Sequence, residues 1–128
     1  MQWELITEGQ IVLSVRVDHE LLDWLRPCIS DYAVAQLDPF RDTVLDGVTQ
    51  QRWLKALGEA RDALCTNLRA SVELGQRLPT DPQARERIVR QLVNRDYGRL
   101  PWAGILDELT ALLELAVDSG GAIRVLGD

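Results

Sequence analysis

The side chains that could act as a catalytic base or as metal ligands are few in this sequence. His19 is the only histidine, and a serine or cysteine nucleophile needs such a base within hydrogen-bond reach. No Gly-x-Ser-x-Gly turn occurs, and neither Cys28 nor Cys65 lies in a known catalytic signature. His19 and Asp23 could share one helix face, but two ligands are too few for structural zinc. The sequence therefore predicts no catalytic residue, no metal site and no enzyme activity.

Phosphate-binding motifs are also missing. The chain has neither Gly-x-Gly-x-x-Gly nor the P-loop pattern, so we predict no nucleotide cofactor. Residues 85–99 do contain five arginines: Arg85, Arg87, Arg90, Arg95 and Arg99. A nucleic-acid surface usually needs a positive field over the whole domain, whereas this chain has a net charge of −6. We expect the basic face to balance the chain's own acidic segments, and we predict no nucleic-acid partner.

Three aspartates spaced by four form the least ordinary feature, Asp38, Asp42 and Asp46. Asp38-Pro39 is a typical helix start, so we predict a short helix from there to near Gly47. The aspartates would form one stripe of this helix, opposite the apolar residues Leu37, Phe40, Val44 and Val48. Like charges at this spacing cost about 0.2–0.5 kcal/mol, and an acid near a helix C-terminus opposes the dipole. A stripe without a structural role for Asp42 and Asp46 indicates contacts with a basic partner.

Aromatic side chains flank a second candidate surface, the loop Gly98-Arg99-Leu100-Pro101. Tyr97 and Trp102 beside an exposed arginine suit a protein contact. They equally suit a loop that is pinned to the core, and the sequence leaves both alternatives open. We include Tyr97, Arg99 and Trp102 with the three aspartates as candidate partner-binding residues.

Composition is that of an ordinary globular domain. The 128 residues are 46% hydrophobic and 27% charged, which excludes disorder and favours one domain spanning residues 1–128. Residues 1–48 carry nine acidic and three basic residues, net −6, whereas residues 49–100 carry six and ten, net +4. No apolar run could cross a membrane, and no secretory signal is visible. We therefore expect a cytoplasmic protein whose two cysteines stay reduced.

Two ends of the chain have strand patterns. Trp3–Ile6 and the alternating Ile11–Val17 flank Glu8-Gly9, which predicts a β-hairpin. Ala122–Leu126 predicts a short strand that joins the hairpin, because two strands alone are only marginally stable.

Helical spacing dominates the rest. Asp18 offers a cap for a first helix, which Pro27 would kink or split. The later helices are expected over 38–47, from a Thr49 cap to Leu78, over 82–98 after an Asp81 cap, and from Pro101-Trp102 to the Ser119-Gly120-Gly121 break. Gly58 and Gly75 are possible breaks in the helix that ends at Leu78, so the sequence leaves its continuity open. The sequence thus predicts a predominantly helical α+β fold, with about five helices between the hairpin and the C-terminal strand.

In size, acidity and lack of catalytic motifs, the chain resembles the small acidic bacterial immunity proteins and antitoxins. That resemblance implies a cytoplasmic inhibitor that binds a cognate toxin or enzyme and covers its active site. Nuclease toxins have basic clefts, to which an acidic inhibitor is electrostatically complementary. We therefore expect a non-catalytic protein-binding module. A structural or adaptor subunit of a homo-oligomer or larger complex is the alternative, and a carboxylate enzyme with a borrowed metal is a third. The sequence leaves the partner's identity and the oligomeric state open.

Overall fold

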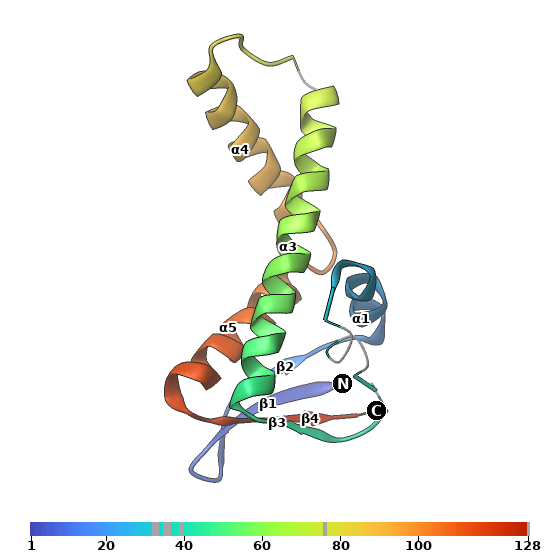
Figure 1. Cartoon of the computed structure of the whole chain (residues 1–128), viewed down its shortest axis with the longest axis vertical. Coiled ribbons are helices and arrows are strands. Elements are labelled where there is room, and N and C mark those ends of the chain that lie inside the picture. Colours follow the sequence, from blue (N-terminus) through green and yellow to red (C-terminus); the bar gives the residue numbers. More distant parts are fainter. Residues whose placement is uncertain (32–33, 35–36, 39, 76, 128) are drawn as a thin grey trace.

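The computed structural model describes residues 1–31, 34, 37–38, 40–75 and 77–127. Figure 1 shows a small sheet at one end of the molecule and helices rising from it. The elements in chain order are β1 (Gln2–Thr7), β2 (Gln10–Arg16), α1 (His19–Leu25), the 3₁₀ turn η1 (Arg26–Cys28), β3 (Thr43–Leu45), α3 (Gly47–Gly75), α4 (Pro82–Gly98), α5 (Ala103–Ser119) and β4 (Ala122–Leu126). The predicted α+β class is confirmed.

The sheet is antiparallel, with the strand order β2-β1-β4-β3. Strands β1 and β2 meet at a turn in which Glu8 has φ 55° and Gly9 has φ 77°, the left-handed values that a two-residue hairpin favours. Strand β4 pairs with β1, so the predicted addition of the C-terminal strand to the hairpin is confirmed. Strand β3 pairs with the other side of β4 and places Val44 opposite Arg124. β2 and β3 are therefore the two edge strands.

The helices lie on one face of the sheet, and no described helix covers the other face (Figure 1). Alternate strand residues point toward the helices and are buried: Trp3, Leu5, Val15, Ile123 and Val125. The indole rings of Trp3 and Trp53 meet edge to face, with centroids 5.0 Å apart. This period-two alternation joins the sheet to α3 and α5 in one core.

Helix α3 is continuous over 29 residues, about 43 Å at 1.5 Å per residue. Its first half packs on the sheet with Trp53, Leu57 and Ala60 buried, at the spacing of one helix face. Its second half and α4 extend beyond the body as two adjacent helices, the helical arm (Figure 1). The arm has a small apolar cluster of its own, built on Val72, Val89 and Val93.

The predicted helix from Asp38 to Gly47 is wrong. Thr43–Leu45 instead form β3, and the Leu45 side chain is buried against the core. Thr43 and Val44 are β-branched and suit a strand. Asp38 accepts a hydrogen bond from the Phe40 backbone N–H at 2.9 Å, a local bond of the kind that competes with helix formation. Pro39, the predicted first helical residue, lies outside the described residues.

Other helix boundaries are close to those predicted. Helix α3 begins at Gly47, with Asp46 rather than Thr49 as its cap, and ends at Gly75 rather than Leu78. Helix α4 has the predicted bounds, and Asp81 accepts from the Ala84 N–H at 3.0 Å. Because residues 43–45 form a strand, the described residues contain four α-helices rather than five, and the sheet gains a fourth strand.

The first helix divides where the sequence predicts. Helix α1 ends at Leu25, and Pro27 lies in η1 directly after it. Asp18 has the extended backbone of an N-cap residue but makes no side-chain capping bond. The negative charge of Glu20 still lies in the first turn, where it favours the helix dipole.

Candidate functional site: a protein contact surface beside β3

Large apolar side chains are exposed at both edges of the sheet. Near β3, Phe40, Val44 and Val48 are 66%, 67% and 70% exposed. The other edge exposes Ile11, Val12 and Leu13 on β2 and Leu115 on α5, while Leu74 is exposed by itself on the helical arm. Contiguous exposed apolar groups mark interaction surfaces. The two sheet edges are therefore the candidate sites.

The β3 surface consists of six exposed side chains at every second position: Asp38, Phe40, Asp42, Val44, Asp46 and Val48. In extended chain, alternate residues point the same way, so Asp42 and Asp46 flank Val44 on the side opposite buried Leu45. A helix would have separated the aspartates from the apolar residues. The extended chain instead places Asp42, Val44 and Asp46 on one side, with Phe40 before it in a turn and Val48 after it in the first turn of α3.

Each aspartate of the β3 surface accepts a hydrogen bond from a backbone N–H: Asp38 from Phe40 at 2.9 Å, Asp42 from Gly127 at 2.9 Å and Asp46 from Thr49 at 2.8 Å. The prediction that Asp42 and Asp46 lack a structural role is wrong for this reason. A carboxylate has about four acceptor sites on two oxygens. Asp38 also forms an ion pair with Arg41 at 3.5 Å, and Thr49 adds a side-chain bond to Asp46. Acceptor sites still remain on the carboxylates.

Asp46 lies at the N-terminus of α3 and not near the C-terminus of a helix. The backbone and side-chain hydrogen bonds from Thr49 hold the pKa of the Asp46 carboxyl below its ordinary value. A negative charge at this end of a helix is favourable. The unfavourable dipole contact expected from the sequence is therefore replaced by a stabilising one.

The β3 surface is attached to the body from two sides. The Phe40 ring meets the His19 ring edge to face, with centroids 4.9 Å apart. At the other side, Gly127 lies so close that an added Cβ would be 2.5 Å from the backbone of Phe40 and Arg41. Between this segment and α3 is a pocket of about 310 Å³, partly lined by Leu37, Arg41 and Trp53.

The second predicted group, Tyr97, Arg99 and Trp102, is mostly tied to the protein. Tyr97 is buried, and its hydroxyl donates to Asp107 at 3.1 Å. Trp102 is half-buried, with its ring centroid 5.0 Å from that of Trp24. Arg99 is exposed. The loop is thus pinned to the core at both aromatic residues, and Arg99 is the member of the group open to a partner.

Helix α1 borders the β3 surface and the group of Tyr97, Arg99 and Trp102 without bringing them into one site. His19 at its start contacts Phe40, and Trp24 near its end contacts Trp102. The β3 surface is consequently the more complete candidate, since all six of its members are exposed.

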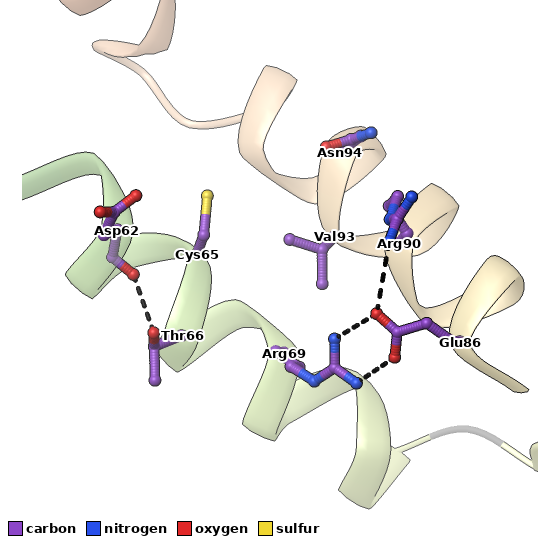
Figure 2. Close-up of a pocket in the computed structure, with 8 residues that line it drawn as sticks. All are labelled: Asp62, Cys65, Thr66, Arg69, Glu86, Arg90, Val93 and Asn94. Carbon is purple, nitrogen blue, oxygen red and sulfur yellow. Dashed lines mark hydrogen bonds and ion pairs between the residues drawn. The ribbon is translucent and has the colours of Figure 1, made fainter. Parts of the chain in front are cut away.

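The helical arm holds a charged pocket of about 330 Å³ (Figure 2). Arg69 of α3 forms a two-pronged ion pair with Glu86 of α4, and Arg90 approaches the same carboxylate at 3.8 Å. The bonds to Arg69 hold the pKa of Glu86 below its ordinary value. Basic and acidic groups in this pocket neutralise each other, so Arg69 joins α3 to α4 and the arginines do not present a uniform positive surface.

Chemical groups suited to catalysis or metal binding are sparse in the described part of the chain. It contains no group of three His, Cys, Asp or Glu side chains that could hold a metal ion. Asp23, the possible companion of His19, pairs with Arg26 at 2.9 Å. Within the same residues, no helix is long and apolar enough to cross a membrane.

Comparisons of the chain with known proteins found no matching family, no matching curated protein and no matching solved structure. Its function therefore has to be argued from its own residues.

Sequence reasoning placed the apolar members of the β3 surface on the wrong side. Thr43-Val44-Leu45 is a strand-favouring run between Asp42 and the turn-forming Asp46-Gly47, and this signal could have identified β3. The run Ile11-Val12-Leu13 likewise breaks the period-two alternation of β2. That break indicates a bulge with apolar groups left exposed.

Proposed function

We propose that this protein is a non-catalytic binding module, and that its β3 surface binds a basic protein partner. The observation that carries the proposal is the combination of three widely exposed apolar side chains with three exposed aspartates on one short segment. A surface of this kind matches a partner with an apolar centre and a basic rim.

The apolar members supply the affinity in this proposal. Fully burying a valine or phenylalanine side chain is worth roughly 1.5–3 kcal/mol, and Phe40, Val44 and Val48 have most of that area still to bury. The backbone of Val44 is already ordered by β3 and that of Val48 by the first turn of α3, and the Phe40 N–H is held by Asp38. A pre-ordered surface loses little conformational entropy on binding.

The aspartates supply steering and orientation. Residues 1–48 are net −6, and the β3 surface lies at the end of this acidic stretch. Complementary charge raises the association rate and disfavours partners of the wrong sign. An inhibitor of a basic toxin or enzyme needs both properties, so we propose the inhibitor, or immunity protein, as the concrete form of this module.

Site-specific photo-crosslinking in cells of the natural source tests this proposal. Val44 is replaced by a photo-crosslinking phenylalanine derivative, and the matched control carries the same group at Leu74, which is 91% exposed on the helical arm. We expect a discrete heterologous adduct from position 44 only. Peptide mass spectrometry then identifies the captured protein, which should be basic.

The crosslinking experiment separates the proposed module from the alternative of an adaptor subunit. An acidic or membrane-embedded captured protein, or equal capture from positions 44 and 74, contradicts the proposed surface. Capture of a second copy of the chain from position 44 would assign the β3 surface to self-association instead.

A further inference from the structure

The opposite edge of the sheet has its own exposed apolar group, and it points to a partner of a different kind. We propose that a second copy of this chain binds there, with β2 pairing against β2 and α5 against α5 about a two-fold axis. The dimer surface consists of Ile11, Val12 and Leu13 on β2 and Ala111 and Leu115 on α5. This inference is independent of the proposed function, because β2 and β3 lie at opposite edges of the sheet.

The backbone of β2 has hydrogen-bonding groups to offer at this edge. Val17 and Met1 exchange two backbone hydrogen bonds, with Val17 N–H donating to the Met1 carbonyl at 2.9 Å and the Met1 nitrogen to the Val17 carbonyl at 3.0 Å. Because such pairs alternate along an antiparallel ladder, the N–H and C=O groups of Ser14 and Arg16 point to the open edge. Edge strands of this length are templates for another strand unless they are protected.

Protection of this edge is slight. The strand Gln10–Arg16 contains no proline and no lysine, and its one charge is at the end. Val12 forms a bulge, since Leu5 pairs with Leu13 and Ile6 pairs with Ile11. The bulge leaves only a few edge backbone groups available. A pairing of two β2 strands must therefore draw most of its stability from the apolar side chains.

Helix α5 extends the apolar area above the strand. Glu108, Ala111 and Leu115 follow one another at spacings of three and four, so they share one flank of the helix. Glu108 and Ala111 line a pocket of about 280 Å³ together with Leu13, which places this flank at the β2 edge. The lengths also match, since α5 is about 25 Å long and β2 is about 23 Å long.

Charge complementarity identifies a second copy as the occupant. Glu8 and Arg16 lie at opposite ends of the β2 edge, both exposed, and no ion pair is found for either among the described residues. Antiparallel pairing centred between Val12 and Leu13 puts Arg16 of each copy across from the Glu8-Gly9 turn of the other. The same register puts Val12 of each copy across from Leu13 of the other, and Ile11 across from Ser14. Such an isologous contact closes at two copies and leaves both β3 surfaces free.

Sedimentation equilibrium over a concentration series tests the dimer. We expect the wild-type chain to associate to twice its monomer mass. Val12→Lys and Leu115→Glu, each at an exposed position, should raise the dissociation constant at least about tenfold without changing the circular dichroism spectrum. The matched controls, Val44→Lys at the other sheet edge and Leu74→Glu on the arm, should associate like wild type.

A charge exchange adds a readout that a nonspecific contact would not produce. Arg16→Glu and Glu8→Arg should each raise the dissociation constant about 2- to 30-fold, as expected for two exposed ion pairs per dimer. The variant with both changes should return close to the wild-type value. A wild-type chain that remains monomeric at millimolar concentration overturns the proposal. So does a dimer that persists in Val12→Lys and Leu115→Glu, dissociates in Val44→Lys, or is strengthened by Glu8→Arg alone.

Discussion

The carboxylate of Asp46 accepts a hydrogen bond of 2.8 Å from the backbone N–H of Thr49, in the first turn of α3. This contact makes Asp46 the cap of the longest helix. It also fixes the point at which the extended chain of β3 turns into α3. A residue predicted to oppose a helix dipole therefore stabilises one.

Replacement of the cap should lower stability. We expect Asp46→Ala to reduce the midpoint of thermal unfolding, because the Thr49 N–H loses its acceptor. Asp46→Asn should keep the midpoint close to that of wild type, because its amide oxygen can still accept the hydrogen bond from Thr49. Asp62→Ala, at an exposed position of α3, is the control and should unfold like wild type. Equal midpoints for Asp46→Ala and wild type would contradict the capping role.

The same cap gives a pH dependence with a defined sign. The folded-state pKa of Asp46 lies below its ordinary value of 3.8. Its contribution to the free energy of unfolding is therefore fully present above pH 3.8 and is lost as the pH falls below that value. Acid unfolding monitored by circular dichroism should show this loss in wild type. In Asp46→Asn this part of the pH dependence should be absent.

Gln50 joins two distant parts of the chain. Its buried side-chain amide donates to the carbonyl oxygens of Leu45 and Gly121, both at 2.9 Å. Gln50→Leu leaves both carbonyls without this donor and should cost roughly 1–3 kcal/mol in the free energy of unfolding. Gln51→Leu, at the exposed neighbouring position, should change it by less than about 0.5 kcal/mol. Denaturant unfolding measures both, and similar values for the two variants would disprove the role of Gln50.

The buried face of α3, which includes Trp53, Leu57 and Ala60, makes a further prediction. The Leu57 side chain is buried in the core, so Leu57→Ala should lower the free energy of unfolding by about 2–5 kcal/mol. Lys55→Ala, at an exposed position of the same helix, should cost less than about 0.5 kcal/mol. Leu64, which is only half-buried, should give an intermediate loss. Equal losses for Leu57→Ala and Lys55→Ala would mean that the helix faces the core differently.

Tyr97 should make stability sensitive to alkaline pH. Burial, and then the hydrogen bond to Asp107, raise the pKa of Tyr97 to about 12. Its stabilising contribution is therefore present below the unfolded pKa of about 10 and is lost between about pH 10 and 12. Unfolding of wild type and Tyr97→Phe across this range should show a steeper alkaline loss for wild type. Parallel curves would contradict the assignment.

Local sequence signals were sufficient to predict the elements whose structure is determined by residues close together in the chain. The Glu8-Gly9 turn, the Asp81-Pro82 start of α4 and the Ala122–Leu126 strand all agree with the structure. At each of these places, turn chemistry or capping agrees with the apolar pattern.

Segment 38–48 could not be assigned correctly from spacing alone, because its structure depends on partners far along the chain. β3 exists by pairing with β4, and Asp42 is held by Gly127, 85 residues away. The aspartate spacing of four fits a helix, whereas the alternation of exposed residues fits a strand. Tertiary pairing decides between the two periods. The aspartates were selected because they would form a helical stripe without a structural role, whereas the structure shows a strand and a backbone hydrogen bond to each of them. Their exposed apolar neighbours were not selected.

Binding to the partner captured at position 44 tests the central claim most directly, and isothermal titration calorimetry at two salt concentrations measures it. We predict that Val44→Asp weakens binding at least about tenfold, or 1.4 kcal/mol, while Leu74→Asp on the arm leaves it unchanged. The wild-type affinity should also fall as salt rises, because salt screens the aspartates. Equal affinities for wild type and Val44→Asp, with no dependence on salt, would contradict the β3 surface as the site of a basic partner.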